Sequence, residues 1–268
     1  MDIRPVGVFD SGLGGLTTVK KLAEYLPGED IIYLGDTGRV PYGSRSGETI
    51  IKYANQDAAF LAQFDIKAMI VACNTVCSTA FHVLENVYDF PVFEVINISA
   101  KAAASCSENN KIGVIGTNAT IRSGAYEKAL KEISSKLCVL SIACPLFVPM
   151  VEYDRTDGND IAALTIAGDY LKELKESGID TLILGCTHYP LLRGVISKIM
   201  GNDVSLIDSG AQTALHVANV LKERNLLSEK KTGGSKRYYI TDNVVDFEKL
   251  ASRFLDSPVD GLVEQVTL

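Results

Sequence analysis

The sequence predicts an α/β protein of two pseudo-symmetric lobes, each a mainly parallel sheet flanked by helices. Strand and helix patterns alternate along most of the 268 residues, which is typical of parallel sheets with helical crossovers. Two apolar runs end in a cysteine followed by small polar residues, at residues 72–75 and 185–188. An Asp-Ser-Gly tripeptide ends a predicted strand twice, at residues 10–12 and 208–210. These paired strand ends indicate two related lobes that face one another.

The composition is that of an ordinary globular protein. Apolar residues make up 47% and charged residues 22% of the chain, and the net charge is −7. This acidic balance argues against nucleic acid or an anionic membrane as the main partner. Six cysteines are too few for a disulfide scaffold, and no apolar run approaches the roughly 20 residues that span a bilayer. We expect free thiols in a reducing cytoplasm and see no leader before the first strand.

The first part of the chain is expected to hold four strands, with a helix after each of the first three. The strands are placed at residues 6–9, 31–34, 68–72 and 92–95. The helices are placed at residues 17–25, 46–64 and 77–88. The first helix is closed by Pro27 and Gly28, and the second has Ile50, Ala54 and Leu61 along one apolar face.

The rest of the chain continues the alternation. Strands are expected at residues 111–115, 139–143, 181–184, 204–207 and 237–241. Helices are expected at residues 99–106, 126–137, 159–177, 211–224 and 247–254. Residues 144–152 are interpreted as an apolar loop that ends in a lone carboxylate, Glu152, and residues 228–236 as a solvated turn before a last apolar stretch from Val259.

We expect two domains. Residues 1–97 together with residues 210–268 form the lobe that carries Cys73, and residues 98–209 form an inserted lobe that carries Cys186.

Two loops at strand ends are candidates for ligand contact. Residues 10–16 are rich in glycine, but Thr17 occupies the position where a dinucleotide-binding loop requires glycine, and no P-loop lysine follows. The exposed backbone N–H groups of this loop would instead suit a small anion such as a carboxylate. Residues 35–43 form a long loop that is equally well explained as a functional loop or as a surface turn.

The two strand-end cysteines are the central observation, because ligands bind at the carboxyl ends of parallel strands. Zinc is disfavoured because Cys73 and Cys77, and likewise Cys138 and Cys144, lack the usual ligand spacing. A Cys-His hydrolase would leave Cys73 unexplained, and a redox pair would need the two sulfurs in contact. The remaining possibility is an acid and a base on opposite faces of a carbon, with the helix after each strand lowering the thiol pKa.

Four motifs together resemble the glutamate racemases, which are cofactor-independent members of the aspartate/glutamate racemase superfamily. They lie at residues 10–15, 41–43, 72–75 and 185–190, and the resemblance runs from Val6 past Ser209. It implies two lobes with the site in the cleft between them, and interconversion of L- and D-glutamate without cofactor or metal. It also implies a bacterial cytoplasmic homodimer that provides D-glutamate for peptidoglycan, with no nucleic-acid or membrane partner.

The resemblance also implies a role for each site residue. Cys73 and Cys186 would be the two bases, Asp10 would assist Cys73, and His188 with Glu152 would assist Cys186. The positions that would hold the substrate are Asp10, Ser11, Pro41, Tyr42, Gly43, Asn74, Thr75, Thr117, Thr187 and His188. Without the resemblance, Asp10 would be a helix N-cap, Glu152 a solvated carboxylate, and His188 as readily a core histidine as a site residue.

The chain departs from the family pattern in two places. Gly38 stands where alanine is more usual, and Val76-Cys77 where Ala-Ser is more usual, so that an oxidisable thiol lies near Cys73. No extension precedes the first strand, which puts in doubt the activation by a cell-wall precursor seen in some relatives. The alternatives to a glutamate racemase are an aspartate racemase and a catalytically idle amino-acid-binding protein.

Overall fold

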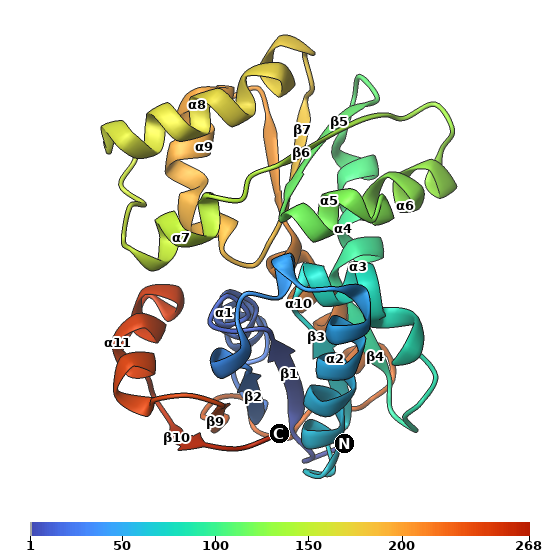
Figure 1. Cartoon of the computed structure of the whole chain (residues 1–268). Helices are drawn as coiled ribbons and strands as arrows, with labels where there is room; N and C mark the ends of the chain where they lie inside the picture. The colour runs from blue at the N-terminus through green and yellow to red at the C-terminus, as the bar shows by residue number, and fades with distance from the viewer. Residues whose placement is uncertain (1) are drawn as a thin grey trace.

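The structure of the chain, a computed structural model, describes residues 2–268 and has the predicted α/β fold (Figure 1). Within these residues the strands form two sheets. The larger sheet contains β1 (Val6–Asp10), β2 (Ile31–Gly35), β3 (Ala68–Val71), β4 (Val92–Glu94), β9 (Lys236–Ile240) and β10 (Leu262–Gln265). The smaller sheet contains β5 (Lys111–Gly116), β6 (Cys138–Ala143), β7 (Thr181–Gly185) and β8 (Ser205–Asp208). The strand orders are β10-β9-β2-β1-β3-β4 and β6-β5-β7-β8, and every pair is parallel.

Helices flank both sheets, which is why the central strands β1, β3 and β7 are buried along their whole length. Around the larger sheet lie α1 (Leu16–Tyr25), α2 (Gly47–Ala62), α3 (Asn74–Ala80) and α11 (Val244–Leu255). Around the smaller sheet lie α5 (Asn118–Arg122), α6 (Ala125–Ile133), α7 (Phe147–Glu152), α8 (Ile161–Glu176) and α9 (Arg193–Met200). No helix within residues 2–268 is both long enough and apolar enough to cross a membrane.

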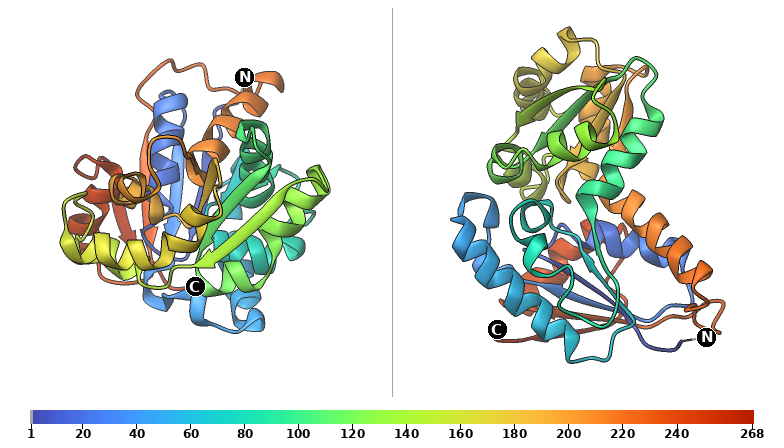
Figure 2. Two further views of the ribbon diagram at one scale, coloured as in Figure 1. Left: turned by 90° about the horizontal axis from the view of Figure 1, so that it is seen from above. Right: turned by 90° about the vertical axis from the view of Figure 1, so that its right-hand side faces the viewer.

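Two helices carry the chain between the lobes. The first is α4 (Val95–Cys106), which follows β4, and the second is α10 (Ser209–Glu223), which follows β8. They pack against each other, α4 also against the smaller lobe and α10 against α1. Seen from the side, both run along the same flank of the molecule (Figure 2).

The predicted helix at residues 77–88 is wrong at both ends. Helix α3 begins at Asn74, directly after Cys73, and ends at Ala80, after which a 3-10 turn covers Phe81–Val83. The predicted strand end and loop at residues 95–98 are also wrong, because α4 begins at Val95. The reason is Glu94, whose carboxylate accepts hydrogen bonds from the backbone N–H groups of Ile96 and Asn97 and so caps the helix.

The segment between β6 and β8 contains more helix than predicted. The expected loop at residues 144–152 folds into α7, so that Glu152 is the last residue of a helix rather than a loop residue. Helix α9 was not predicted, because its short buried stripe of Val195, Ile196 and Met200 is preceded by Gly194 and a 3-10 turn, Tyr189–Leu192. The final apolar stretch from Val259 contains β10, an edge strand paired with β9.

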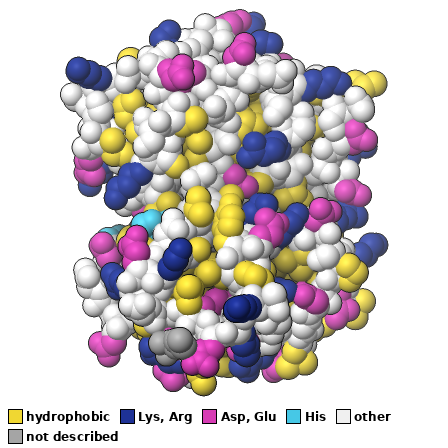
Figure 3. Space-filling view, turned by 180° about the vertical axis from the view of Figure 1, so that it is seen from behind, with side chains coloured by type: hydrophobic (Ala, Val, Ile, Leu, Met, Phe, Trp, Pro, Cys, Tyr) yellow, Lys and Arg dark blue, Asp and Glu magenta, His cyan; other side chains and the backbone are white. Residues whose placement is uncertain are grey.

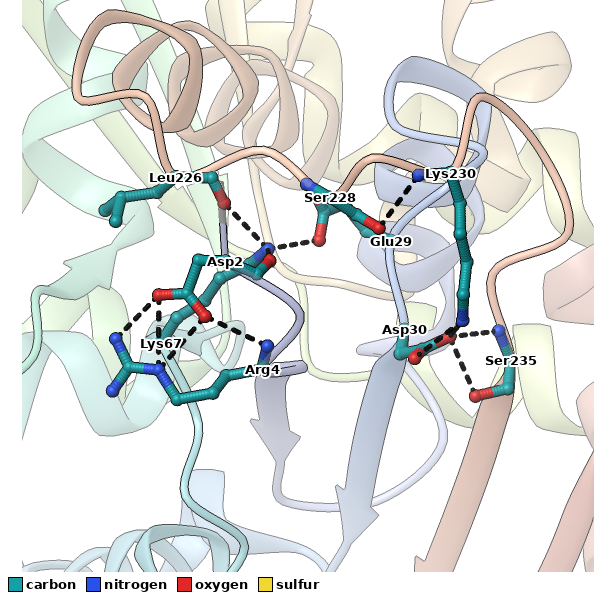
Figure 4. Close-up of polar contacts among 9 residues, drawn as sticks. All are labelled: Asp2, Arg4, Glu29, Asp30, Lys67, Leu226, Ser228, Lys230 and Ser235. Atoms are coloured by element: carbon teal, nitrogen blue, oxygen red, sulfur yellow. Dashed lines mark hydrogen bonds and ion pairs between the residues drawn. The ribbon is translucent and has the colours of Figure 1, made fainter.

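A buried ion pair fastens the N-terminal segment and the segment after α10 to the larger lobe (Figure 4). Lys67 and Glu29 are 1% and 4% exposed and precede β3 and β2. The Lys67 ammonium donates to the Glu29 carboxylate and, at 2.8 Å each, to the carbonyls of Asp2 and Leu226. The second Glu29 oxygen accepts from the backbone N–H of Ser228 at 2.7 Å. Because all these groups have partners, their attraction and hydrogen bonds offset the desolvation penalty of the buried pair.

Lys67→Met should therefore lower the free energy of unfolding by about 3–5 kcal/mol, because it leaves the Glu29 carboxylate buried without a cation. The matched control is Lys230→Met, which removes the exposed ion pair with Asp30 and should cost less than about 1 kcal/mol. Urea denaturation followed by circular dichroism measures both. Equal losses in the two variants would contradict the account.

Candidate active site

A cavity of about 270 Å³ lies where the carboxyl ends of the two sheets face each other. From behind, the space-filling view shows the lobes as two masses with an indentation between them and apolar side chains across the middle (Figure 3). The cavity is lined from both lobes by twelve of the residues singled out from the sequence: Ser11, Pro41, Tyr42, Gly43, Cys73, Asn74, Thr75, Thr117, Glu152, Cys186, Thr187 and His188. Asp10 is fully buried behind this wall.

Cys73 follows β3 and occupies the N-cap position of α3. The residue is 5% exposed, and its thiol donates to the Ser11 hydroxyl at 3.4 Å. Burial, with the nearby Asp10 charge, raises the pKa of the Cys73 thiol to about 12, while hydrogen bonds from Ser11 and the Val76 backbone oppose the shift. The helix start that was expected to favour the thiolate is present, but burial has the larger effect. The thiol is therefore protonated at neutral pH.

Cys186 directly follows β7 and is also 5% exposed. Burial raises the pKa of its thiol well above the usual value, and a hydrogen bond from the His188 backbone N–H opposes the shift. The expectation of a helix directly after the cysteine is wrong here, because a 3-10 turn intervenes before α9 begins at Arg193. The two thiols face one cavity from different lobes, and both are neutral at pH 7.

Asp10, the last residue of β1, links the two lobes. Its carboxylate accepts hydrogen bonds from the Gly12 backbone N–H at 3.1 Å and from the Thr187 hydroxyl at 3.4 Å. Burial raises its pKa, while the nearby His188 lowers it. Asp10 is not a helix N-cap, since that position of α1 is Gly15. The glycine loop was expected to hold an external anion with its backbone N–H groups. The N–H of Gly12 in this loop binds the Asp10 carboxylate instead.

His188 and Glu152 form a second pair beside Cys186. His188 Nε2 lies 3.4 Å from Glu152 Oε1, and the side chains are 9% and 38% exposed. The separation permits an ion pair, but the angles do not give a hydrogen bond, and Nε2 has no hydrogen-bond partner within the described part of the chain. His188 is therefore not a fully satisfied core histidine. An unpaired buried nitrogen at a cavity wall is suited to a proton-transfer role.

Further contacts join the lobes through residues of the cavity wall. The Thr75 and Thr117 hydroxyls are 3.0 Å apart, and Asn74 donates its amide to the Ser209 hydroxyl at 3.3 Å. The Tyr126 hydroxyl donates to the Asn74 amide oxygen at 2.6 Å. Sequence reasoning did not assign Tyr126 or Ser209 to the site. The repeated Asp-Ser-Gly tripeptide was a signal for Ser209, whereas nothing in the sequence pattern marked Tyr126.

The Tyr42 side chain points its hydroxyl into a buried cluster of charges. That hydroxyl donates to the Asp36 carboxylate and lies 3.0 Å from Asp57 Oδ2, and Arg39 donates to Asp57 Oδ1 at 2.9 Å. Burial, with the neighbouring Asp36 charge, raises the pKa of Asp57 well above its usual value. The cluster fixes the loop that forms one cavity wall. A molecule in the cavity would therefore meet the backbone of Tyr42 rather than its hydroxyl.

Several cavity-lining residues were not predicted. They are Gly12, Val40, Ser44, Asn118, Pro145, Val148, Pro149 and Tyr189. Ser44 and Asn118 directly adjoin predicted site residues, which could have indicated them. The group at residues 145–149 was missed because that stretch was interpreted as a loop rather than as the start of α7. Within residues 2–268 no three His, Cys, Asp or Glu side chains are grouped so as to hold a metal ion.

Comparison with known proteins agrees with this arrangement. Residues 7–217 match the family described as Asp/Glu/hydantoin racemase. A glutamate racemase of Geobacter metallireducens is 46% identical over 268 residues, which is 100% of this chain and 98% of the relative. The crystal structure of a Bacillus anthracis glutamate racemase isoform superposes with a TM-score of 0.94 at 39% identity, covering 100% of this chain and 99% of the other. A Francisella tularensis glutamate racemase in complex with D-glutamate gives 0.91 at 40% identity, covering 100% and 98%.

The raised pKa of Cys73 can be tested by alkylation with iodoacetamide, which reacts with the thiolate. With a pKa of about 12, the thiolate fraction, and with it the alkylation rate of Cys73, should rise about tenfold per pH unit from pH 7 to 10 without a plateau. The same residue in the urea-unfolded chain is the control and should level off above its ordinary pKa of about 8.5. Mass spectrometry of the Cys73 peptide measures the rates. A plateau near pH 8.5 in the folded protein would contradict the assignment.

Proposed function

Because the chain belongs to the glutamate racemases of the Asp/Glu/hydantoin racemase family, we propose that it interconverts L-glutamate and D-glutamate with Cys73 and Cys186 as its two proton-transfer groups. The observation that carries the proposal is the placement of the two thiols, which enter one cavity from opposite lobes. Inversion at a carbon needs a base on one face and an acid on the other. Two groups of the same kind serve both directions of the reaction.

In each turnover one thiolate removes the Cα proton. An S–H bond forms as the C–H bond breaks, and the electron pair left on Cα is delocalised into the substrate carboxylate. The opposite thiol then gives its proton to the other face of Cα, which yields the other enantiomer and leaves that cysteine as a thiolate. Proton exchange with solvent restores the starting state, so no oxidant or reductant is needed.

The ammonium group of the substrate favours the thiolate form that the reaction needs. Both thiols are neutral in the free protein because burial disfavours the thiolate. An amino acid brings an ammonium group into the same low-dielectric cavity, and a nearby positive charge lowers a thiol pKa. On this proposal Asp10 takes up the proton that Cys73 loses on becoming a thiolate, and the imidazole of His188, backed by Glu152, takes up the proton that Cys186 loses.

The remaining polar groups of the cavity would hold the substrate. The carboxylates and the ammonium of the substrate would bind to hydroxyl and amide side chains of the cavity, which are those of Ser11, Asn74, Thr75, Thr117 and Thr187. The loop at residues 41–43 would contribute backbone groups of Pro41, Tyr42 and Gly43. This division of roles is supported by the presence of these hydroxyl and amide side chains in the cavity wall and by the commitment of the Tyr42 hydroxyl elsewhere.

The proposal extends to the setting of the enzyme. Its product would be the D-glutamate of bacterial peptidoglycan, and the protein would act as a cytoplasmic homodimer. We divide the chain into one domain of residues 1–97 and 210–268 and a second of residues 98–209. This division is supported by the sheets, since strands from the first two segments form the larger sheet and those from the third form the smaller one.

The purified protein should racemise either enantiomer of glutamate with no added cofactor, and the activity should survive a chelator and a carbonyl reagent. Circular dichroism of the substrate follows the reaction. L-Aspartate is the matched comparison and should turn over more slowly. If the wild-type protein binds glutamate but the circular dichroism signal of the glutamate does not change, or if the protein prefers aspartate, the proposed activity is wrong.

Cys73→Ala and Cys186→Ala should each lower the racemisation rate about 10²- to 10⁴-fold, because each removes a positioned acid or base. Cys144→Ala is the control, since Cys144 is also buried but does not line the cavity, and it should keep near-normal activity. The same assay measures all three. Wild-type rates in both single variants of the proposed pair would refute the two-thiol mechanism.

A further inference from the structure

Helix α11 belongs to the larger lobe but its last turn reaches the smaller one. It packs on α1 and near β10, and Figure 1 shows it directly below α7 on the open side of the molecule. Two consecutive residues near its end, Arg253 and Phe254, contact residues of the smaller lobe across the gap. The residues that make these contacts are up to about 100 positions apart in the sequence, and no sequence motif marked Arg253 or Phe254.

Phe254 forms a wall beside His188. Its side chain is 2% exposed, and its ring meets the imidazole edge to face, with the centroids 5.2 Å apart and the planes at 87°. The Gly14 backbone also crowds the imidazole, since a Cβ at that position would come within 2.5 Å of Nδ1. Contacts with a buried aromatic ring and a tightly packed backbone restrict the rotation of His188. They keep its Nε2 near Glu152.

Arg253 acts on the neighbouring segment. One guanidinium nitrogen donates to the Glu152 carbonyl at 3.3 Å, and another lies 3.4 Å from the Asp154 carboxylate. The Glu152 carbonyl is at the C-terminal end of α7, where the helix leaves carbonyls unpaired and favours a cation. The same turn of α11 therefore touches both His188 and the residue that lies beside it.

We propose that Phe254 and Arg253 are positioning residues, which hold His188 and Glu152 in place beside Cys186. The inference rests on the proposed function, in which His188 and Glu152 serve Cys186 and not Cys73. Its consequence is an asymmetric effect. Loosening the end of α11 should slow proton transfer on the Cys186 face and leave transfer on the Cys73 face unchanged.

The decisive experiment compares exchange with conversion in D₂O. The two enantiomers have equal free energies, so kcat/KM must fall equally in both directions and cannot reveal which face is impaired. A carbanion formed by Cys73 that is not reprotonated from the Cys186 face persists until the Cys73 thiol has exchanged its proton with D₂O, and it then returns to its starting enantiomer with deuterium at Cα. NMR measures how much deuterium the remaining substrate has gained at Cα and how much product has formed. The ratio of the first quantity to the second reports this return. The Cys186→Ala variant identifies the enantiomer that Cys73 deprotonates, as the one that still exchanges.

Phe254→Leu keeps apolar volume but removes the ring. We expect kcat/KM to fall about tenfold, and the exchange-to-conversion ratio to rise by a similar factor for the enantiomer that Cys73 deprotonates. Arg253→Gln should shift the ratio in the same direction by less, and Phe254→Tyr, which keeps the ring, should restore it. Phe247→Leu is the matched control, because Phe247 is buried in the same helix but packs on Tyr238. It should leave the ratio unchanged.

An unchanged ratio in a folded, active Phe254→Leu protein, or equal shifts in the Phe254 and Phe247 variants, would overturn the inference. Absence of racemisation by the wild type would instead overturn the proposed function. In that case the inference is still tested by the ¹⁵N signals of the His188 ring. They should change in Phe254→Leu and not in Phe247→Leu, and identical spectra in both variants would refute the positioning role.

Discussion

The site depends on how closely two strand-end loops approach each other across the lobes. Thr187 and His188 lie against the glycine loop so tightly that a Cβ at Gly14 would be 2.0 Å from the Thr187 hydroxyl oxygen. Only glycine allows this contact. Because the loops meet, the Asp10 carboxylate can bind the Gly12 N–H of its own lobe and the Thr187 hydroxyl of the other. The same approach lets Cys73 and Cys186 face a common cavity.

Burial has opposite effects on the chemistry of this site. It removes the thiols from water, which raises their pKa and keeps the resting protein in an unreactive, protonated form. The same low dielectric strengthens every interaction with a charge that enters the cavity. A substrate ammonium therefore has a larger influence on the thiols than it would have in water. On the proposed mechanism, thiolate formation is in this way linked to the binding of the ligand.

The sequence was a good guide to the sheets and to the two thiols. Apolar runs that alternate with helical patterns predicted nine strands. The cysteines that follow two of these strands marked the sheet edge where the cavity forms. Helix boundaries were less accessible, because α4 begins where the side chain of Glu94 caps it rather than where the apolar pattern changes. The short helix α7 was interpreted as a loop, so Glu152 was placed on the wrong kind of element.

Contacts between distant segments could not be derived from the sequence pattern. The hydrogen bond from Tyr126 to Asn74 and the ring contact of Phe254 with His188 depend on how the lobes are oriented. Neither residue lies in a motif. The family resemblance named the residues at the cavity wall, but the partners that orient them became visible only in three dimensions.

The central claim is that each thiol serves one face of Cα. The most direct measurement is the incorporation of deuterium from D₂O into L- and D-glutamate by Cys73→Ala and Cys186→Ala. The account predicts that each variant exchanges the Cα proton of one enantiomer only, and that the two variants exchange opposite enantiomers. Exchange of both enantiomers by one variant, or of the same enantiomer by both, would contradict it.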